Sequence, residues 1–382
     1  MEDSVNLSRI STRSAVLVGA LALTLTACSS DSESPTSTTP GATGGGETQS
    51  QELSGNLAGA GASSQGKAME GWIAGFNEMA PDVILSYDPA GSGSGREQFL
   101  AGAVQFAGSD AALKEEELTA AQERCYGGEA IEVPLYISPI AVIYNLPGVA
   151  AENLQMSAET LAKIFNGDIT SWNDPAIAAE NEGVELPDLT IIPVNRSDES
   201  GTTENFVEYL AAAGNGAWPH EVSGDWPVSG GQSGQGTQGV VDTVSAAEGT
   251  IGYADASRAG ELGTVAIKVG EEYVPFSPEA AAKVVDASPR AEGATDKRLI
   301  VELDRTTTEA GAYPLVLMSY SVACSVYEDA ADAANVKALF SYMASEEGQA
   351  RAADPAVAGS APISSELRTE VMAAIDSIST AS

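Results

Sequence analysis

Short apolar runs alternate with segments of helical periodicity along most of the chain. Six runs have the length and composition of strands: 83–87, 131–137, 140–145, 189–194, 251–254 and 315–323. Between them, apolar residues recur every three or four positions, as from Met69 to Met79. The alternation predicts an α/β fold. The apolar stretch 131–145 is broken at only four positions, so one domain could pass into another there.

The N-terminal part of the chain does not follow this pattern. Two arginines precede an apolar run, 15–27, that is too short to span a bilayer comfortably and ends in small residues before Cys28. This order is typical of an export signal, with an N-terminal anchor helix as the alternative. The next residues are mostly Ser, Thr, Gly, Pro and acid, which predicts a flexible tether. We therefore expect a signal peptide over 1–27, a tether over 28–52 and a folded body from residue 53.

Charge and cysteine content narrow the possible partners. The 382 residues carry a net charge of -36, which argues against nucleic acid and against an anionic membrane surface. A small anionic ligand stays possible, because exposed charges beyond roughly 10 Å are largely screened. Besides Cys28 the chain has only Cys125 and Cys324. In an exported protein such a pair favours a disulfide over two free thiols.

Three segments share one order of apolar run, small polar loop and helix start: 53–76, 83–104 and 190–210. A helix start has unpaired N–H groups and a dipole that favours negative charge, and glycine, serine and threonine allow close approach and add donors. One such loop alone is usually a cap and a turn. Three that converge predict an anion site. The second loop approaches a dinucleotide fingerprint, but Arg96 stands where its third glycine belongs.

Two charged residues give this predicted site its chemistry. Arg196 directly precedes the third helix start, and its guanidinium can bind two oxygens of a tetrahedral anion. Asp198 either orients that guanidinium or is a cap or solvated turn carboxylate. Asp110 follows a small apolar run, where it would ordinarily be a helix cap. Beside an anion site, an ionised carboxylate accepts a protonated anion such as phosphate and repels sulfate, which has no proton near neutral pH.

The body resembles the phosphate-binding proteins that serve bacterial phosphate-specific ABC transporters. Six stretches stand in that family's order and spacing: 58–63, 87–95, 104–113, 196–203, 229–241 and 249–257. The resemblance implies a type II periplasmic-binding-protein fold, an α/β fold with two lobes, two hinge strands and the ligand cleft between the lobes. It places lobe one at 53–138 and 317–382 and lobe two at 139–316, with Cys125 and Cys324 both in lobe one.

The resemblance also implies a set of phosphate-binding residues: Ser63, Ser64, Ser92, Asp110, Arg196, Ser200, Gly201 and Thr202. Asp198 would orient Arg196, and Ser64 would contribute its amide. Many relatives have Thr-Phe where this chain has Ser63 and Ser64, which makes the wall less apolar. Residues 25–28 resemble a bacterial lipobox. Cys28 would then carry a lipid that anchors the protein to the outer face of the cell membrane. The expected partners are inorganic phosphate and an ABC permease, and the expected state is a monomer.

Other functions remain as alternatives. A hydrolase usually needs a base near its nucleophile, and the single histidine, His220, lies outside the three loops, where we expect a surface or packing role. We expect neither an enzyme, nor a metal site, nor a cofactor. Arsenate is an alternative ligand, and sulfate is disfavoured by Asp110. A surface sensor or adhesin that uses the same fold is a further alternative.

Overall fold

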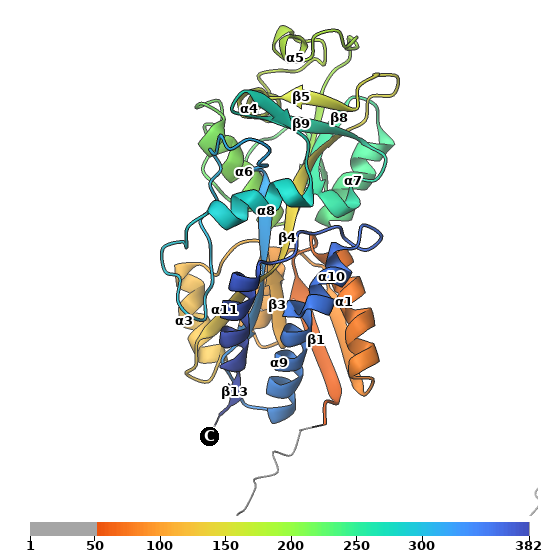
Figure 1. The fold of residues 1–382 in the computed structure, drawn as a ribbon. Coiled ribbons are helices and arrows are strands. Elements are labelled where there is room, and N and C mark those ends of the chain that lie inside the picture. The colour runs from red at the N-terminus through yellow and green to blue at the C-terminus, as the bar shows by residue number, and fades with distance from the viewer. Residues whose placement is uncertain (1–51, 382) are drawn as a thin grey trace, which may run out of the picture. The chain divides into compact units, whose positions relative to one another are not determined.

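The computed structural model describes residues 52–381, shown in Figure 1. The predicted signal peptide, Cys28 and all but the last residue of the predicted tether lie outside the described residues. No helix within 52–381 is long and apolar enough to cross a membrane.

One half of the body is built on a parallel core extended by antiparallel strands. Strand β1 (Gly55–Gly61) pairs in parallel with β2 (Val83–Asp88) and with β3 (Phe106–Ser109). Strand β11 (Val316–Cys324) runs antiparallel to β3 and to the first part of β4 (Ala130–Tyr144). We call this part, with the helices packed on it, the β1 half.

The other part, the β8 half, continues from the second part of β4. From Ile140 onward β4 pairs with β8 (Thr250–Asp255), which is parallel to β6 (Ile192–Arg196). The remaining strands lie beyond these: β7 (Gln232–Gly234) pairs with β6, and β9 (Gly263–Val269) pairs with β4, β5 (Asn153–Met156) and β10 (Glu272–Val274).

Helices belong to one half or the other according to their place in the chain. Those of the β1 half are α1 (Gly66–Met79), α2 (Ser92–Leu100), α3 (Glu115–Arg124), α9 (Ala330–Ala344), α10 (Glu346–Ala353) and α11 (Ser365–Asp376). Those of the β8 half are α4 (Ala158–Asn166), α5 (Pro175–Glu180), α6 (Gly201–Ala213), α7 (Gly236–Ala246), the 3-10 turn η1 (Ala256–Arg258) and α8 (Pro278–Ala287). A short parallel pair, β12 (Val326–Tyr327) and β13 (Ser379–Thr380), lies near the C-terminus.

The two apolar runs at 131–137 and 140–145 are parts of one strand, β4, which is buried at all of its positions. The two prolines of β4 do not end the strand, because each lies where the hydrogen-bonded pairing of β4 with its neighbour strand changes. Pro134 lies at an irregularity in the pairing with β11, between Ser319 and Tyr320. At Pro139 the pairing with β11 ends, and the pairing with β8 begins at the next residue. The division into lobes at 138/139 and 316/317, taken as parts that move separately, stays a prediction.

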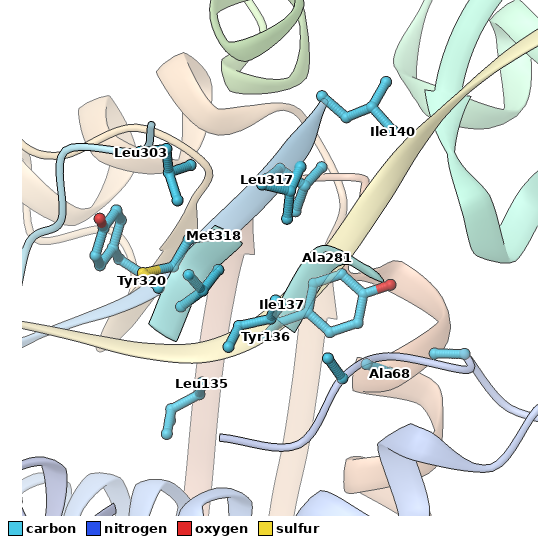
Figure 2. Packing of buried hydrophobic residues seen from close by; sticks show 14 of the residues in the cluster. Ala68, Leu135, Tyr136, Ile137, Ile140, Ala281, Leu303, Leu317, Met318 and Tyr320 are labelled. Carbon is cyan, nitrogen blue, oxygen red and sulfur yellow. The ribbon is translucent and has the colours of Figure 1, made fainter. Parts of the chain in front are cut away.

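The hydrophobic core continues through the place where β4 and β11 leave one half for the other. Figure 2 shows Ile137 and Ile140 of β4 with Leu317 and Met318 of β11, and Ala281 of α8 close by. All five side chains are buried. A smaller cluster that includes Val194, Val240 and Val244 lies between α7 and the β8 half of the sheet. The continuous packing makes β4 and β11 the structural link between the halves.

A disulfide joins Cys125, just after α3, to Cys324 at the end of β11. Both cysteines are buried and both lie in the β1 half, with their Cα atoms 5.1 Å apart. They are 199 positions apart in the chain, so the bond closes a loop that contains the whole β8 half. On the chain-entropy account a loop of that length stabilises the fold by about 5 kcal/mol.

Candidate functional site

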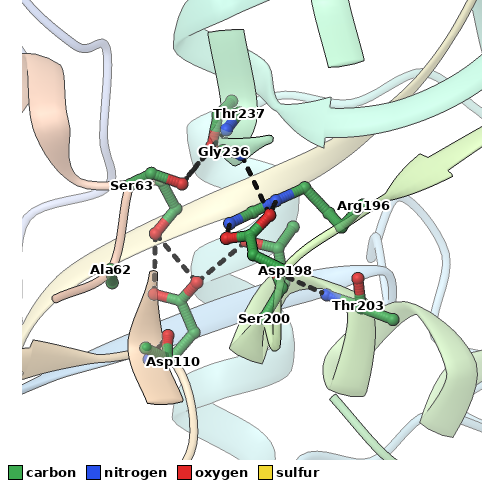
Figure 3. Close-up of polar contacts among 12 residues, drawn as sticks. Ala62, Ser63, Asp110, Arg196, Asp198, Ser200, Thr203, Gly236 and Thr237 are labelled. Carbon is green, nitrogen blue, oxygen red and sulfur yellow. Dashed lines mark hydrogen bonds and ion pairs between the residues drawn. The ribbon is translucent and has the colours of Figure 1, made fainter. Parts of the chain in front are cut away.

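The predicted site residues lie where parallel strands end in each half, as ligand-binding loops do in open α/β sheets. In the β1 half, Ser63 and Ser64 follow β1, Ser92 follows β2, and Asp110 follows β3. In the β8 half, Arg196 is the last residue of β6. Figure 3 shows the side chains of the two halves facing each other.

Asp110 accepts hydrogen bonds from both halves. The Ser64 hydroxyl lies 2.7 Å from Oδ1 and 2.8 Å from Oδ2 of Asp110, and the Thr202 hydroxyl of α6 donates to Oδ2 at 2.9 Å. The backbone of Asp110 is held as well, since its N–H donates to Ser92 Oγ at 3.1 Å and its carbonyl accepts from Asn205 Nδ2 at 2.7 Å. The alternative role as a helix cap is wrong, because α3 begins later and is capped at Lys114.

Burial raises the pKa of Asp110 above its ordinary value, because the charged form loses its contact with water. The hydroxyls of Ser64 and Thr202 and the charge of Arg196 act in the opposite direction and limit the rise. A carboxylate with a raised pKa is a better proton acceptor. Asp110 is therefore suited to hold a hydrogen bond from a ligand that still carries a proton.

Arg196 is buried, with 3% of its surface exposed, and is held by Asp198 from its own loop. Its Nε donates to Asp198 Oδ1 at 2.9 Å, and its Nη2 pairs with Oδ2. The backbone N–H of Gly236, at the start of α7, also donates to Asp198 Oδ1 at 3.0 Å. Burial alone would raise the pKa of Asp198, but these partners hold that pKa below its ordinary value. Asp198 is therefore paired with Arg196 and is not a solvated turn carboxylate.

Glycines let the helix starts of the two halves meet. A side-chain carbon on Gly201, the first residue of α6, would lie 2.7 Å from Ser92 Oγ and 2.8 Å from Asp110 Cβ. A side-chain carbon on Gly91, just before α2, would lie 2.7 Å from Asp198 Oδ2, and the φ of Gly91, 102°, also favours glycine. Two of the three predicted helix starts, those of α2 and α6, therefore approach each other closely beside Asp110 and Asp198.

Comparison with known proteins shows the family to which this chain belongs. A family model described as a PBP superfamily domain matches residues 38–347. The phosphate-binding protein PstS 3 of Mycobacterium leprae is 37% identical over 287 residues, covering 74% of this chain and 77% of the relative. PstS3 of Mycobacterium bovis is 34% identical over 373 residues, covering 95% and 97%. The chain belongs to the PstS phosphate-binding protein family.

Solved structures agree on the fold. A high-affinity periplasmic phosphate-binding protein, PfluDING, solved with bound phosphate, has a TM-score of 0.68 at 23% identity and covers 83% of this chain and 93% of its own. The phosphate binding protein of Stenotrophomonas maltophilia has a TM-score of 0.63 at 19% identity, covering 84% and 94%. The predicted periplasmic-binding-protein fold is confirmed.

In this PstS family member the other two predicted site hydroxyls, those of Ser63 and Ser200, also have partners within the protein. Ser200 caps α6, since its Oγ accepts the N–H of Thr203 at 3.2 Å. Ser63 Oγ lies 3.0 Å from Thr237 Oγ1 and accepts the N–H of Thr237 at 3.1 Å. Both serines keep a hydroxyl proton or lone pair for a further bond.

The start of α7 is a fourth helix start at this site, which sequence reasoning missed. Gly236 contacts Asp198 and Thr237 contacts Ser63, so α7 touches loops of both halves. The stretch that precedes α7 has the same order of short strand, glycine, hydroxyl and helix as the other three loops. That pattern could have found it.

Aromatic residues of the β8 half pack together beneath the loop of Arg196 and the start of α6. Tyr253 OH lies 2.7 Å from Thr203 Oγ1, accepts the backbone N–H of Arg196 at 3.3 Å, and stacks on Phe206. Trp226 packs against the same two rings. Trp218 lies edge-on to His220, whose Nε2 bonds Asn166 Oδ1 at 2.9 Å. His220 is thus a partly exposed residue that packs on Trp218, as the expected surface or packing role implies. Among residues 52–381 no group of metal-binding side chains occurs.

Proposed function

We propose that this chain captures inorganic phosphate outside the cell and delivers it to the permease of an ABC importer. The observation that carries the proposal is the meeting of Asp110 from the β1 half with Thr202 of the β8 half, beside the buried Arg196. A proton acceptor and a fixed cation at one place, among helix starts, match a tetrahedral anion that keeps a proton at neutral pH. Membership of the PstS family supports the same ligand.

In this proposal each predicted residue has one role at the ligand. Asp110 accepts a hydrogen bond from the protonated oxygen of the anion. Arg196, oriented by Asp198, binds two oxygens of the anion. The remaining donors surround it through hydroxyls and amides: Ser63, Ser64, Ser92, Ser200, Gly201 and Thr202. The hydroxyl of Ser64 donates to Asp110, so at Ser64 the backbone amide would face the ligand.

Capture requires that the two halves separate and close as lobes about β4 and β11. All seven proposed ligand residues that have side chains are at most 8% exposed. An anion could therefore reach them only if the two halves move apart. The closed form would then be presented to the permease, and the event would be capture rather than catalysis. A lipid on Cys28 would keep the monomeric protein at the outer face of the cell membrane.

Calorimetric titration of the body, residues 53–382, with phosphate, arsenate and sulfate near neutral pH tests the proposal. We expect tight one-to-one binding of phosphate and no heat of binding from sulfate. Equal binding of sulfate would contradict the role of Asp110. Heat of binding from arsenate, but not from phosphate or sulfate, would make arsenate the ligand of the same site. No heat of binding from any of the three anions would favour a sensor or adhesin.

A further inference from the structure

We propose that Arg96 is a positioning residue that latches the two halves together around the ligand, through an ion pair with Glu199. The pair joins α2 of the β1 half to the loop before α6 of the β8 half, with Arg96 Nη2 at 3.0 Å from Glu199 Oε1. The proposal rests on the proposed function, since it concerns how long the closed form retains phosphate. Neither Arg96 nor Glu199 is among the proposed ligand residues.

Arg96 is one of the most deeply buried charged residues of the body, with 1% of its surface exposed. Its Nε lies 3.1 Å from both carboxylate oxygens of Glu117 on α3, and its Nη1 donates to Ser109 Oγ at 3.0 Å. These two partners belong to the β1 half, so they hold the guanidinium in place whether the halves are together or apart. Only the Nη2 contact with Glu199 crosses between the halves.

Glu199 is seated between glycines of both halves. A side-chain carbon on Gly93, in α2, would lie 1.8 Å from Glu199 Oε2, and one on Gly224, in the β8 half, would lie 2.8 Å from Oε1. Any other residue at these two positions would occupy the space that the carboxylate fills. The fit shows that the Glu199 carboxylate has a defined place in the closed form, directly against the backbone of α2.

The latch is connected to the ligand loops on both sides. Glu199 stands between Asp198, which orients Arg196, and Ser200, which caps α6. Arg96 shares α2 with Ser92 and bonds Ser109, the residue before Asp110. Opening the cleft must therefore break the Arg96 to Glu199 pair at the same time as it withdraws Arg196 from Asp110. A contact made only in the closed form slows release more than it speeds capture.

A second ion pair between the halves offers a matched control. Arg258 of η1 lies 3.4 Å from Glu70 of α1, and the side chain of Glu70 is 63% exposed. An exposed pair at this distance contributes little, because water and salt screen it. Arg96 and Glu199 differ from this pair in burial, since their side chains are 2% and 25% exposed.

The test is the release of radiolabelled phosphate from the full chain into excess unlabelled phosphate, for the wild type, Glu199→Gln, Arg96→Lys and Glu70→Gln. We expect release to be about tenfold faster in Glu199→Gln and Arg96→Lys, from the loss of a charged hydrogen bond. We expect capture rates to change by less than about threefold, and Glu70→Gln to match the wild type. Wild-type release from both latch variants overturns the proposal. Arg96→Lys keeps the charge but loses the planar fork, so it carries the test if Glu199→Gln does not fold.

Hydrogen exchange without ligand separates this proposal from the function. If the wild type does not bind phosphate, the proposed function fails, but the latch still predicts faster exchange in Glu199→Gln over 91–95 and 199–203. The Ser200 amide, which donates to the carbonyl of Gly224, lies in that second segment. Faster exchange there in Glu199→Gln, and not in Glu70→Gln, supports the latch. Without phosphate binding, equal exchange in both overturns it.

Discussion

The two halves of the site contribute opposite chemistry. The β1 half brings Asp110, a hydrogen-bond acceptor, with the hydroxyls of Ser64 and Ser92 around it. The β8 half brings Arg196, a fixed cation, together with the start of α6. The proposed phosphate would therefore find its proton acceptor on one side and its counter-charge on the other. Neither half alone would both attract an anion and select a protonated one.

Two carboxylates show how each half sets its chemistry. Burial raises the pKa of Asp110, which prepares it to accept a proton. Asp198 also loses contact with water, but the bonds and charge of Arg196 keep its pKa below the ordinary value, so it stays an anion. The difference arises because Asp198 has an arginine as its direct partner and Asp110 has only hydroxyls.

Among the predicted changes, removal of the cation Arg196 is expected to have the largest effect on phosphate binding. We expect Arg196→Ala to weaken phosphate binding by roughly a thousandfold or more, because loss of one partner of a buried charge pair costs about 3–5 kcal/mol. Calorimetric titration with phosphate measures this change. Arg258→Ala, which removes a more exposed arginine of the same half, is the matched control and should bind as the wild type does. Near wild-type affinity in Arg196→Ala would place the site elsewhere.

Neutralising the acceptor is expected to change selectivity. We expect Asp110→Asn to bind sulfate at least a hundredfold better than the wild type does, since the carboxylate no longer repels an anion that lacks a proton. Competition titrations with sulfate and phosphate measure the ratio. Asp88→Asn changes an exposed aspartate at the end of β2 and should leave the ratio unchanged. Unchanged discrimination in Asp110→Asn would refute the proton-acceptor role.

A third prediction contrasts Asp110 with Asp255, a fully buried aspartate of the β8 half. Asp255 accepts from Tyr136 OH at 3.0 Å and from the N–H of Ser257 at 3.0 Å, but its Oδ2 has no partner among the described residues. Burial raises the pKa of Asp255 from its ordinary value of 3.8 to about 6, although these hydrogen bonds oppose the rise. The folded state therefore binds this proton more tightly than the unfolded state does. The resulting stability is present below about pH 4 and is lost as the pH rises through about 6.

The measurement is the free energy of unfolding of wild type and Asp255→Asn by denaturant between pH 4 and pH 8. We expect the variant to gain about 3 kcal/mol relative to the wild type across this range, because it has no carboxylate to ionise. The comparison cancels the titration of other groups. Parallel pH profiles for the two proteins would show that Asp255 ionises normally.

Several features of this protein follow from local sequence pattern alone. Alternating apolar runs and helical periods predicted an α/β fold, and glycine and hydroxyl runs marked three of the four helix starts at the site. Asp110 and Arg196 stood out because of their positions beside such loops. These inferences succeed because strand periodicity and helix starts depend on neighbours within a few residues.

Other features depend on which distant residues the fold brings together. Local pattern predicted two strands where β4 is one, since only the pairing with β11 and then β8 carries the strand past its prolines. Thr237 meets Ser63 from 174 positions away, and the hydroxyl of Thr202 reaches Asp110 from 92 positions away. Likewise, Arg96 looked only like a departure from a glycine motif until its contact with Glu199 was visible. Such contacts are decided by sheet register and by the packing of one half against the other, which no local pattern records.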